Sequence, residues 1–202
     1  MKAIFKSFLV VVLFILFLFI SVYGQAHEVQ AWGHNLYIQN NVPAGLSGVT
    51  AISSGLGHTV ALKYDGTVTA WGFLASSSAI TDVTAVSAGG LHSVALKSDG
   101  TVVAWGGSNT DGQLNVPSGL VNVKAVSAGF THTLALKADG TVVAWGGNGF
   151  GQSTVPGGLT NVIAVAAGII HSLALKADGT VVSWGGTGSI PSGLTGVIAI
   201  AA

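Results

Sequence analysis

The sequence predicts an all-β fold, an incomplete β-propeller whose antiparallel blades have three to four strands each. A similar unit recurs at intervals of 34, 40 and 39 residues, starting at Val49, Val83, Val123 and Val162. These intervals are typical of repeats in which each unit is one blade. Every unit is rich in β-branched and small residues, and it contains an Asp-Gly pair between two apolar runs, which indicates a β-hairpin.

The composition of the 202-residue chain excludes several classes of function. Seven Lys, no Arg and seven acidic residues give a formal net charge of zero, so there is no basic surface for nucleic acid. The absence of Cys removes disulfides, thiolate nucleophiles and Cys-based zinc sites. The 30 Gly residues follow no collagen-like period and indicate tight turns and closely packed sheets.

The first 26 residues are predicted to be a secretory signal peptide. Lys2 and Lys6 precede an apolar run from Phe8 to Val22, and small residues follow at Gly24 and Ala26. The run is shorter than the roughly 20 apolar residues of a membrane-spanning helix; an uncleaved anchor is the alternative. We therefore expect cleavage after Gly24 or Ala26, no stable membrane insertion afterwards, and a secreted or cell-envelope location.

Within each unit the pattern predicts one strand followed by a hairpin. In the third unit these strands are Val123–Ala128, His132–Lys137 and Thr141–Trp145. The Asp-Gly pair between the second and third strands suits a type I′ turn, in which both central residues have positive φ. A fourth, weaker strand is expected at Gln113–Val116, where the following Pro117 is acceptable on an edge strand.

The two ends of the repeated region match parts of a unit. Residues 29–33 match a last strand, and residues 197–202 match a first strand. We expect a part of a longer ring, with self-association through open blade edges as the alternative. The predicted organisation is a signal peptide over 1–26, a partial repeat over 27–48, full repeats over 49–82, 83–122, 123–161 and 162–196, and the start of a truncated repeat over 197–202.

The unit resembles the repeats of the regulator of chromosome condensation family. The resemblance rests on Gly129–Leu136 and on the Asp-Gly and Trp-Gly pairs that follow, and it covers roughly Val29 to Ala202. The linkers at 147–152 and at Val155–Pro156 look most like those of secreted bacterial members, including a β-lactamase-inhibiting propeller. The resemblance implies a propeller, usually of seven blades, which would need on the order of 270 residues.

Two residue types recur at fixed positions and are predicted to be structural. Each repeated His is expected to be a polar group satisfied by the backbone; a metal site shared between blades is the alternative. Each repeated Trp is expected in the blade core, with a sugar-stacking platform as the alternative. The positions are His58, His92, His132 and His171, and Trp71, Trp105, Trp145 and Trp184. We expect no bound metal and no cofactor.

The sequence predicts no catalytic site. Most of the charge lies in the Asp-Gly hairpins, and the acidic residues elsewhere are Glu28, Asp82 and Asp111. These three form no repeated or paired carboxylates of the kind that acid–base mechanisms use. The chain also contains no nucleophile elbow and no phosphate-binding Gly-rich loop. We therefore expect that the protein is not an enzyme.

The residues that vary between units are the candidates for partner binding, because loops on a rigid scaffold can change at little cost to the fold. One variable site precedes each repeated His, and another follows the Trp-Gly pair; gap filling between blades is the alternative role. The predicted partner-binding residues are Leu56, Leu91, Phe130, Ile169 and Ile170 at the first site, and Tyr37, Asp111 and Phe150 at the second.

These observations favour a secreted or cell-surface interaction scaffold that binds a protein partner through variable loops on one propeller face. Alternatives are a lectin-like propeller, an enzyme-inhibitory propeller, and a purely structural role at the cell surface. Nucleotide exchange on a small GTPase is what the resemblance to eukaryotic family members implies. An exported chain does not fit that activity, and we expect no nucleic acid partner.

Overall fold

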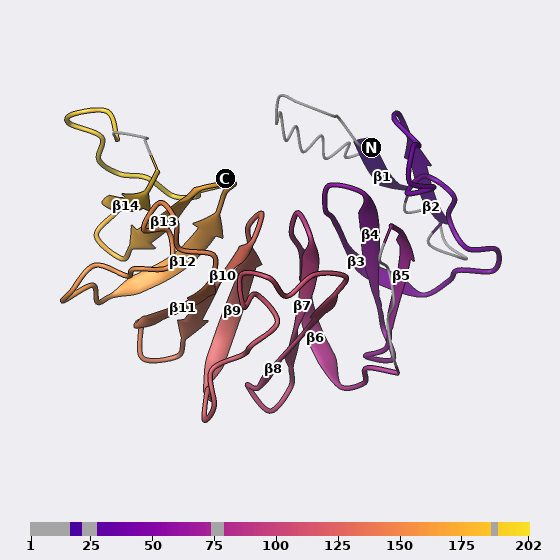
Figure 1. The fold of residues 1–202 in the computed structure, drawn as a ribbon, viewed down its shortest axis with the longest axis horizontal. Coiled ribbons are helices and arrows are strands. Elements are labelled where there is room, and N and C mark those ends of the chain that lie inside the picture. Colours follow the sequence, from indigo (N-terminus) through magenta and orange to yellow (C-terminus); the bar gives the residue numbers. More distant parts are fainter. Residues whose placement is uncertain (1–16, 22–27, 74–78, 187–189) are drawn as a thin grey trace, which may run out of the picture.

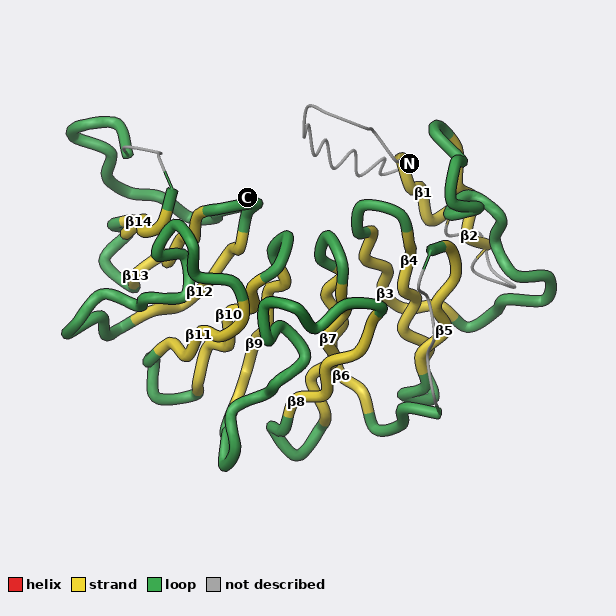
Figure 2. Tube along the Cα trace, viewed as in Figure 1, coloured by secondary structure: helices red, strands yellow, loops and turns green. Residues whose placement is uncertain are grey.

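The computed structural model describes residues 17–21, 28–73, 79–186 and 190–202 of the chain. All of its regular elements are β-strands, arranged blade after blade along an arc (Figure 1). The strands alternate with loops and turns along the whole described chain (Figure 2). These features confirm the predicted all-β propeller class. In the described residues, no helix has the length and apolar character that a membrane crossing requires.

Four sheets of three antiparallel strands form the blades, and in each the second strand in sequence is the middle strand. A two-stranded sheet, β1 with β2, precedes them. The strands are β1 (Phe17–Ser21), β2 (Glu28–Trp32), β3 (Val49–Ser54), β4 (His58–Lys63), β5 (Val68–Gly72), β6 (Val83–Ala88), β7 (His92–Lys97), β8 (Val102–Gly106), β9 (Val123–Ala128), β10 (His132–Lys137), β11 (Val142–Gly146), β12 (Val162–Ala167), β13 (His171–Lys176) and β14 (Val181–Gly185).

The predicted signal peptide lies largely outside the described residues. Within them, β1 pairs antiparallel with β2, and Phe17 lies opposite Trp32. The two expected cleavage positions, Gly24 and Ala26, fall in the part of the chain that is not described.

The middle strands are covered on both faces because blades stack against them from two sides. In β4, β7 and β10, the first five residues are all buried. The core between the first two blades shows the arrangement: Val60 and Leu62 of one blade pack with Val83, Ala88 and Trp105 of the next. Burial of one such Val or Leu side chain contributes about 1.5–3 kcal/mol. The hydrophobic core therefore lies between blades as well as within them.

The hairpins differ from the predicted type I′ turn. At the turn of the third blade, Gly140 has a φ of 80°, whereas Asp139 is not among the residues with positive φ. The Gly140 N–H donates to the Lys137 carbonyl, and the Lys137 N–H donates to the Thr141 carbonyl. This is the three-residue loop that ends with a residue in the left-handed region. The Asp139 side chain instead accepts hydrogen bonds from the N–H and hydroxyl of Thr141.

The expected fourth strand at Gln113–Val116 is wrong. The segment forms tight turns, in which the Asn115 N–H donates to the Gly112 carbonyl and the Val116 N–H donates to the Leu114 carbonyl. These local hydrogen bonds use the backbone groups that a ladder would need, and Gln113 is fully buried. The blades therefore have three strands each.

Candidate partner-binding face

The loops between the first and middle strands of the blades form a continuous row. Hydrogen bonds join each loop to the next: the Leu56 N–H donates to the Gly89 carbonyl at 3.3 Å, and the Phe130 N–H donates to the Gly168 carbonyl at 3.1 Å. Between them, the Gly90 N–H donates to Gly129 at 3.0 Å. The variable residues before each repeated His are thereby held side by side at one edge of the array. We call this the loop edge, and we include in it the loops that follow the third strands.

The repeated histidines hold neighbouring blades together below the loop edge. The Nε2 atom of each of three histidines lies within hydrogen-bond distance of a hydroxyl on the middle strand of the next blade. The pairs are His58 with Ser93 at 2.8 Å, His92 with Thr133 at 2.7 Å, and His132 with Ser172 at 2.9 Å. The expectation that the backbone satisfies these rings is wrong for Nε2, because its partner is a side chain supplied by another repeat.

Burial keeps these histidines neutral. It lowers the pKa of His58 and His132 from 6.5 to about 4, because a charged imidazolium would lose its hydration. The pKa of His92 is also lowered to about 4, mainly by burial and further by its two His neighbours. The described residues contain no group of three side chains suited to holding a metal ion. The geometry therefore indicates that these three histidines form hydrogen bonds between neighbouring blades.

Apolar side chains cover the loop edge of the first blade. Tyr37 packs on Phe73 with ring centroids 4.9 Å apart, and both rings are partly exposed. Leu56 is 52% exposed. Gly57 lies beneath the aromatic pair, and a Cβ atom at this position would come within 2.8 Å of the Tyr37 ring. This close approach explains why the variable pair before His58 includes a glycine.

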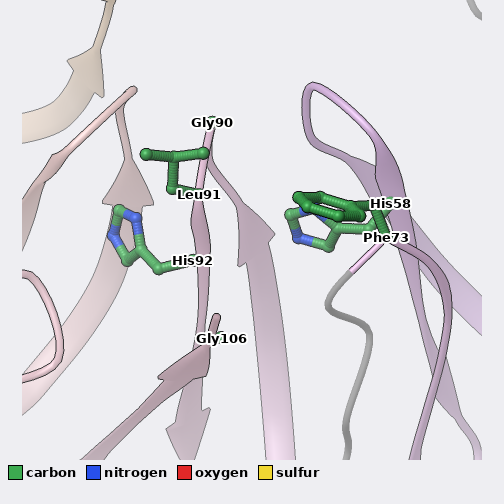
Figure 3. Close-up of a pocket in the computed structure, with 6 residues that line it drawn as sticks. All are labelled: His58, Phe73, Gly90, Leu91, His92 and Gly106. Carbon is green, nitrogen blue, oxygen red and sulfur yellow. The ribbon is translucent and has the colours of Figure 1, made fainter. Parts of the chain in front are cut away.

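A small hollow lies at the loop edge between the first two blades. It is lined by His58, Phe73, Gly90, Leu91, His92 and Gly106 (Figure 3). Phe73 lies on the His58 side of the hollow, and Leu91 lies on the His92 side. Two apolar side chains therefore line this hollow together with the inter-blade histidines His58 and His92.

The apolar surface continues over the third and fourth blades. The Phe130 ring lies over Gly90 of the preceding blade and is half-buried there. Ile169 is 66% exposed, whereas Ile170 is half-buried against Gly186. The structure thus places Leu56, Leu91, Phe130, Ile169 and Ile170 in one row. Leu91, Phe130 and Ile170 also fill space between loops, which is the alternative role considered above.

The second set of candidates, Tyr37, Asp111 and Phe150, lies in equivalent loops after the third strands. In each loop the backbone N–H of the candidate donates to the side-chain oxygen of a Gln two residues later, at 2.9, 3.0 and 2.9 Å. All three candidates are exposed, and Phe150 is exposed by 60%. Tyr37 joins the row through Phe73, whereas no described contact joins Asp111 or Phe150 to it.

Sequence reasoning missed the glutamines that build these loops. Gln39, Gln113 and Gln152 are buried. Their backbone carbonyls accept the Nε1–H of Trp71, Trp145 and Trp184 at 2.8, 3.0 and 2.9 Å. In these three blades, the Trp ring therefore connects the blade to the loop that precedes it. The spacing Asn-x-x-x-Gln, at Asn35, Asn109 and Asn148, is the sequence signal that identifies these loops.

Phe73 was also missed, because it immediately follows a Trp-Gly pair and no equivalent aromatic residue occurs in the other repeats. Its contact with Tyr37 is what places Phe73 on the loop edge. Those two residues are 36 positions apart in the chain and come from different repeats.

Charge is concentrated at the opposite end of the strands, which we call the turn edge. A six-residue middle strand separates the two edges by about 17 Å. Ion pairs at the turn edge join Lys137 to Asp139 at 3.3 Å and Lys176 to Asp178 at 3.2 Å. Lys97 instead contacts Asp82, at 3.9 Å. At the loop edge, Asp111 is the one carboxylate among the described residues.

Comparisons with known proteins agree with this architecture. Residues 49–73, 83–113 and 123–152 match the family model described as regulator of chromosome condensation (RCC1) repeat. The fourth blade has the same motif but lies outside the matched segments. No curated protein matches the chain.

Three solved structures show the likeness in fold. The ectodomain of the receptor kinase CR4 from Physcomitrella patens is 26% identical, with a TM-score of 0.71 over 83% of this chain and 48% of that one. Prp20p from Saccharomyces cerevisiae is 24% identical, with a TM-score of 0.64 over 78% and 52%. The CRINKLY WD40 ectodomain of the receptor kinase ACR4 from Arabidopsis thaliana is 24% identical, with a TM-score of 0.65 over 79% and 62%.

The fold and the inter-blade contacts define the class of protein: a β-propeller repeat protein. More particularly, the chain belongs to the regulator of chromosome condensation repeat family, whose model matches its first three blades. The chain spans about half the length of the first solved structures it matches.

Proposed function

We propose that the protein is a non-enzymatic interaction scaffold, exported from the cell, that binds a protein partner through the loop edge. The observation that carries the proposal is the row of apolar side chains held by hydrogen-bonded loops. Leu56, Phe73 and Ile169 are each between 48% and 66% exposed on it. Large apolar side chains grouped on one edge of a rigid scaffold are typical of protein interfaces.

The separation of charge supports the same proposal. Lys and Asp side chains lie at the turn edge, and the loop edge has Asp111 as its one carboxylate among the described residues. Depletion of charge with enrichment of aromatic residues is the composition of interface cores. A partner that covers the loop edge would therefore desolvate fewer charged groups than one that covers the turn edge.

Solved relatives of the fold support protein binding as the class of function. The yeast protein Prp20p was studied for its binding to Gsp1p and histones, and it was crystallised with Kap60 bound. Export is supported by the sequence of the first 26 residues, which has the charge and apolar pattern of a signal peptide.

The test compares two variants that remove apolar side chains from opposite edges. Phe73→Ala, combined with Ile169→Ala, removes exposed groups from the loop edge. Tyr64→Ala is the matched control, because Tyr64 is 80% exposed at the turn edge. A partner is first identified by crosslinking and mass spectrometry in the native source, then purified and titrated by calorimetry.

We expect the double variant to weaken binding of the purified partner by about tenfold or more, as loss of interface anchors does. The Tyr64→Ala variant should bind as the unmodified chain does. Equal binding by both variants would refute the loop edge as the site. Retention of the chain in the cytosol, measured by fractionation, would refute export.

A further inference from the structure

Ile38 has a backbone conformation that is unusual for its residue type. Its φ is 57°, in the left-handed region, where the side chain of a β-branched residue is crowded by the backbone. In the loops after the second and third blades, the same position before the buried Gln is occupied by Gly112 and Gly151, with φ values of 76° and 82°. Glycine adopts this conformation without steric cost. The loop therefore requires a left-handed residue, and Ile38 supplies it under strain.

Hydrogen bonds on both sides of Ile38 hold the strained conformation. The Ile38 N–H donates to the Asn35 carbonyl at 3.2 Å, and the Ile38 carbonyl accepts from the Asn41 N–H at 3.0 Å. The Asn40 N–H donates to Asn35 Oδ1 at 2.8 Å, and the Asn40 side-chain amide donates to the Gly33 carbonyl at 2.9 Å. Strained residues persist only where the surrounding structure fixes them in this way. Residues 36–38, which we call the loop tip, are thus held in one defined conformation.

Packing within the folded chain does not account for an isoleucine at this position. Its side chain is 59% exposed, and that of Leu36 is 71% exposed. Neither residue belongs to a hydrophobic core cluster of the described residues. Asp111 and Phe150, the equivalents of Tyr37 in loops that lie between complete blades, are exposed as well, so the exposure is a property of this type of loop. The strained side chain therefore gains little from the fold, which points to a role in contact with another molecule.

The loop tip continues the apolar surface of the loop edge. Tyr37 packs on Phe73, with ring centroids 4.9 Å apart, and so joins Leu36 and Ile38 to the row of side chains described above. The three tip residues carry no charge, whereas the equivalent three residues of the loop after the second blade are Thr-Asp-Gly. A charged group of a partner would lose its hydration at this tip without gaining an ion pair. The loop tip therefore favours uncharged, apolar groups.

We propose that Ile38 is a specificity-determining residue of the loop edge. With Leu36 and Tyr37 it binds an uncharged segment of a protein partner that presents aliphatic or aromatic side chains. This inference rests on the proposed function and names the chemistry of the partner segment. Because the loop is already fixed, binding orders few groups on this side of the interface, which reduces the entropic cost of association. Segments that present carboxylates are rejected, because their charge would be buried without a counterpart.

The probes are synthetic peptides chosen by selection of a random phage-displayed library on the immobilised chain, and calorimetry measures their affinity. Ile38→Gly and Ile38→Asn remove the aliphatic side chain, and both new residues accept a positive φ. Ile163→Asn is the matched control for the side chain, because Ile163 is 52% exposed in β12. Gly119→Ile is the control for strain, because Gly119 has a φ of 75° and a Cβ there would meet nothing within 4 Å.

We expect the selected peptides to be rich in aliphatic and aromatic residues and poor in Asp and Glu. Both Ile38 variants should weaken peptide binding by about tenfold, whereas Ile163→Asn should leave it unchanged. Release of strain should raise the thermal midpoint by about 2–4 °C in both Ile38 variants, and Gly119→Ile should lower it by a similar amount. A midpoint that does not rise in Ile38→Gly, or peptide binding that the Ile38 variants leave unchanged, would overturn the inference.

Failure of this inference can be distinguished from failure of the proposed function. If Phe73→Ala combined with Ile169→Ala weakens peptide binding and the Ile38 variants do not, the loop edge stands and the role of Ile38 is refuted. If none of these variants weakens binding, both are refuted. Failure to select any peptide would overturn the inference. Binding to phosphatidylcholine vesicles that Ile38→Asn abolishes would assign the loop tip to a lipid surface, and it would overturn the protein assignment.

Discussion

At the scale of single residues, the side chains that join the blades are small in number and repeat from blade to blade. Each inter-blade contact combines a His that meets a hydroxyl with a Ser hydroxyl that accepts a backbone N–H; Ser127, for example, accepts from Ala167 at 3.0 Å. Both are buried or partly buried, where an unmade hydrogen bond is costly. The stability of the array therefore depends on these few polar groups as well as on apolar burial.

The histidines allow a test with a matched control in the same chain. His132→Ala removes a buried ring, its bond to Ser172 and the packing around both, so we expect a loss of about 2–4 kcal/mol in the free energy of unfolding. His171→Ala, at the equivalent position but without a described partner, should cost less than about 1 kcal/mol. Urea unfolding followed by tryptophan fluorescence measures both values. Equal losses would show that the inter-blade bond contributes nothing measurable.

At the scale of elements, the hairpin turns are uniform because each uses the same two side-chain bonds. Asp139 and Asp178 accept from a Thr N–H and a Thr hydroxyl two residues later. These bonds lower the pKa of both carboxyl groups to about 2. The lowered pKa means that the carboxylates stay charged, and remain acceptors for these hydrogen bonds, under mildly acidic conditions.

The conformation of the turn Gly gives a second prediction. Gly140→Ala forces an Ala to adopt a φ of 80° and brings its Cβ within 3.4 Å of Asn161, so we expect a loss of about 1 kcal/mol. Gly157→Ala is the control, because Gly157 has no positive φ and a Cβ there would meet nothing within 4 Å. Thermal unfolding should separate the two variants; identical midpoints would contradict the turn geometry described here.

The strands were predictable because their signal is local and is repeated in the sequence. The starts of β3, β6, β9 and β12 follow from the recurrence of one apolar pattern. The turn type was not predictable from Asp-Gly alone, because the number of loop residues depends on the register of the flanking strands. Gln113–Val116 was mistaken for a strand because Val116 in fact packs against the core from a turn, next to the buried Gln113.

The candidate site was predictable in part. The variable positions beside each His identified the loops, but not Phe73, whose contact with Tyr37 joins different repeats. The hydroxyl partners of the histidines could not be predicted either, because each lies 35 to 41 residues away along the chain, in the next blade. Contacts between repeats depend on how blades stack, which periodicity alone does not specify.

At the scale of the whole molecule, the inter-blade histidines make the stability of the array depend on pH. Burial lowers the pKa of His58, His92 and His132 to about 4, below the 6.5 of an exposed imidazole. Below pH 6.5 the unfolded chain therefore binds protons that the folded chain does not bind. Protonation of the unfolded state favours unfolding, so stability is full above pH 6.5 and is lost as the pH falls toward 4.

We expect the free energy of unfolding to fall between pH 6.5 and 4, with each of these three histidines contributing at most about 1.4 kcal/mol per pH unit. The turn carboxylates Asp139 and Asp178 lose their contribution as the pH falls from 3.8 to about 2, so the two effects occupy different ranges. Urea unfolding across pH 4–8 gives the slope for the unmodified chain and for His132→Asn. In the variant, the slope of the unfolding free energy against pH should be smaller by the contribution of one histidine. An unchanged slope would mean that His132 takes up a proton as readily in the folded chain as in the unfolded chain.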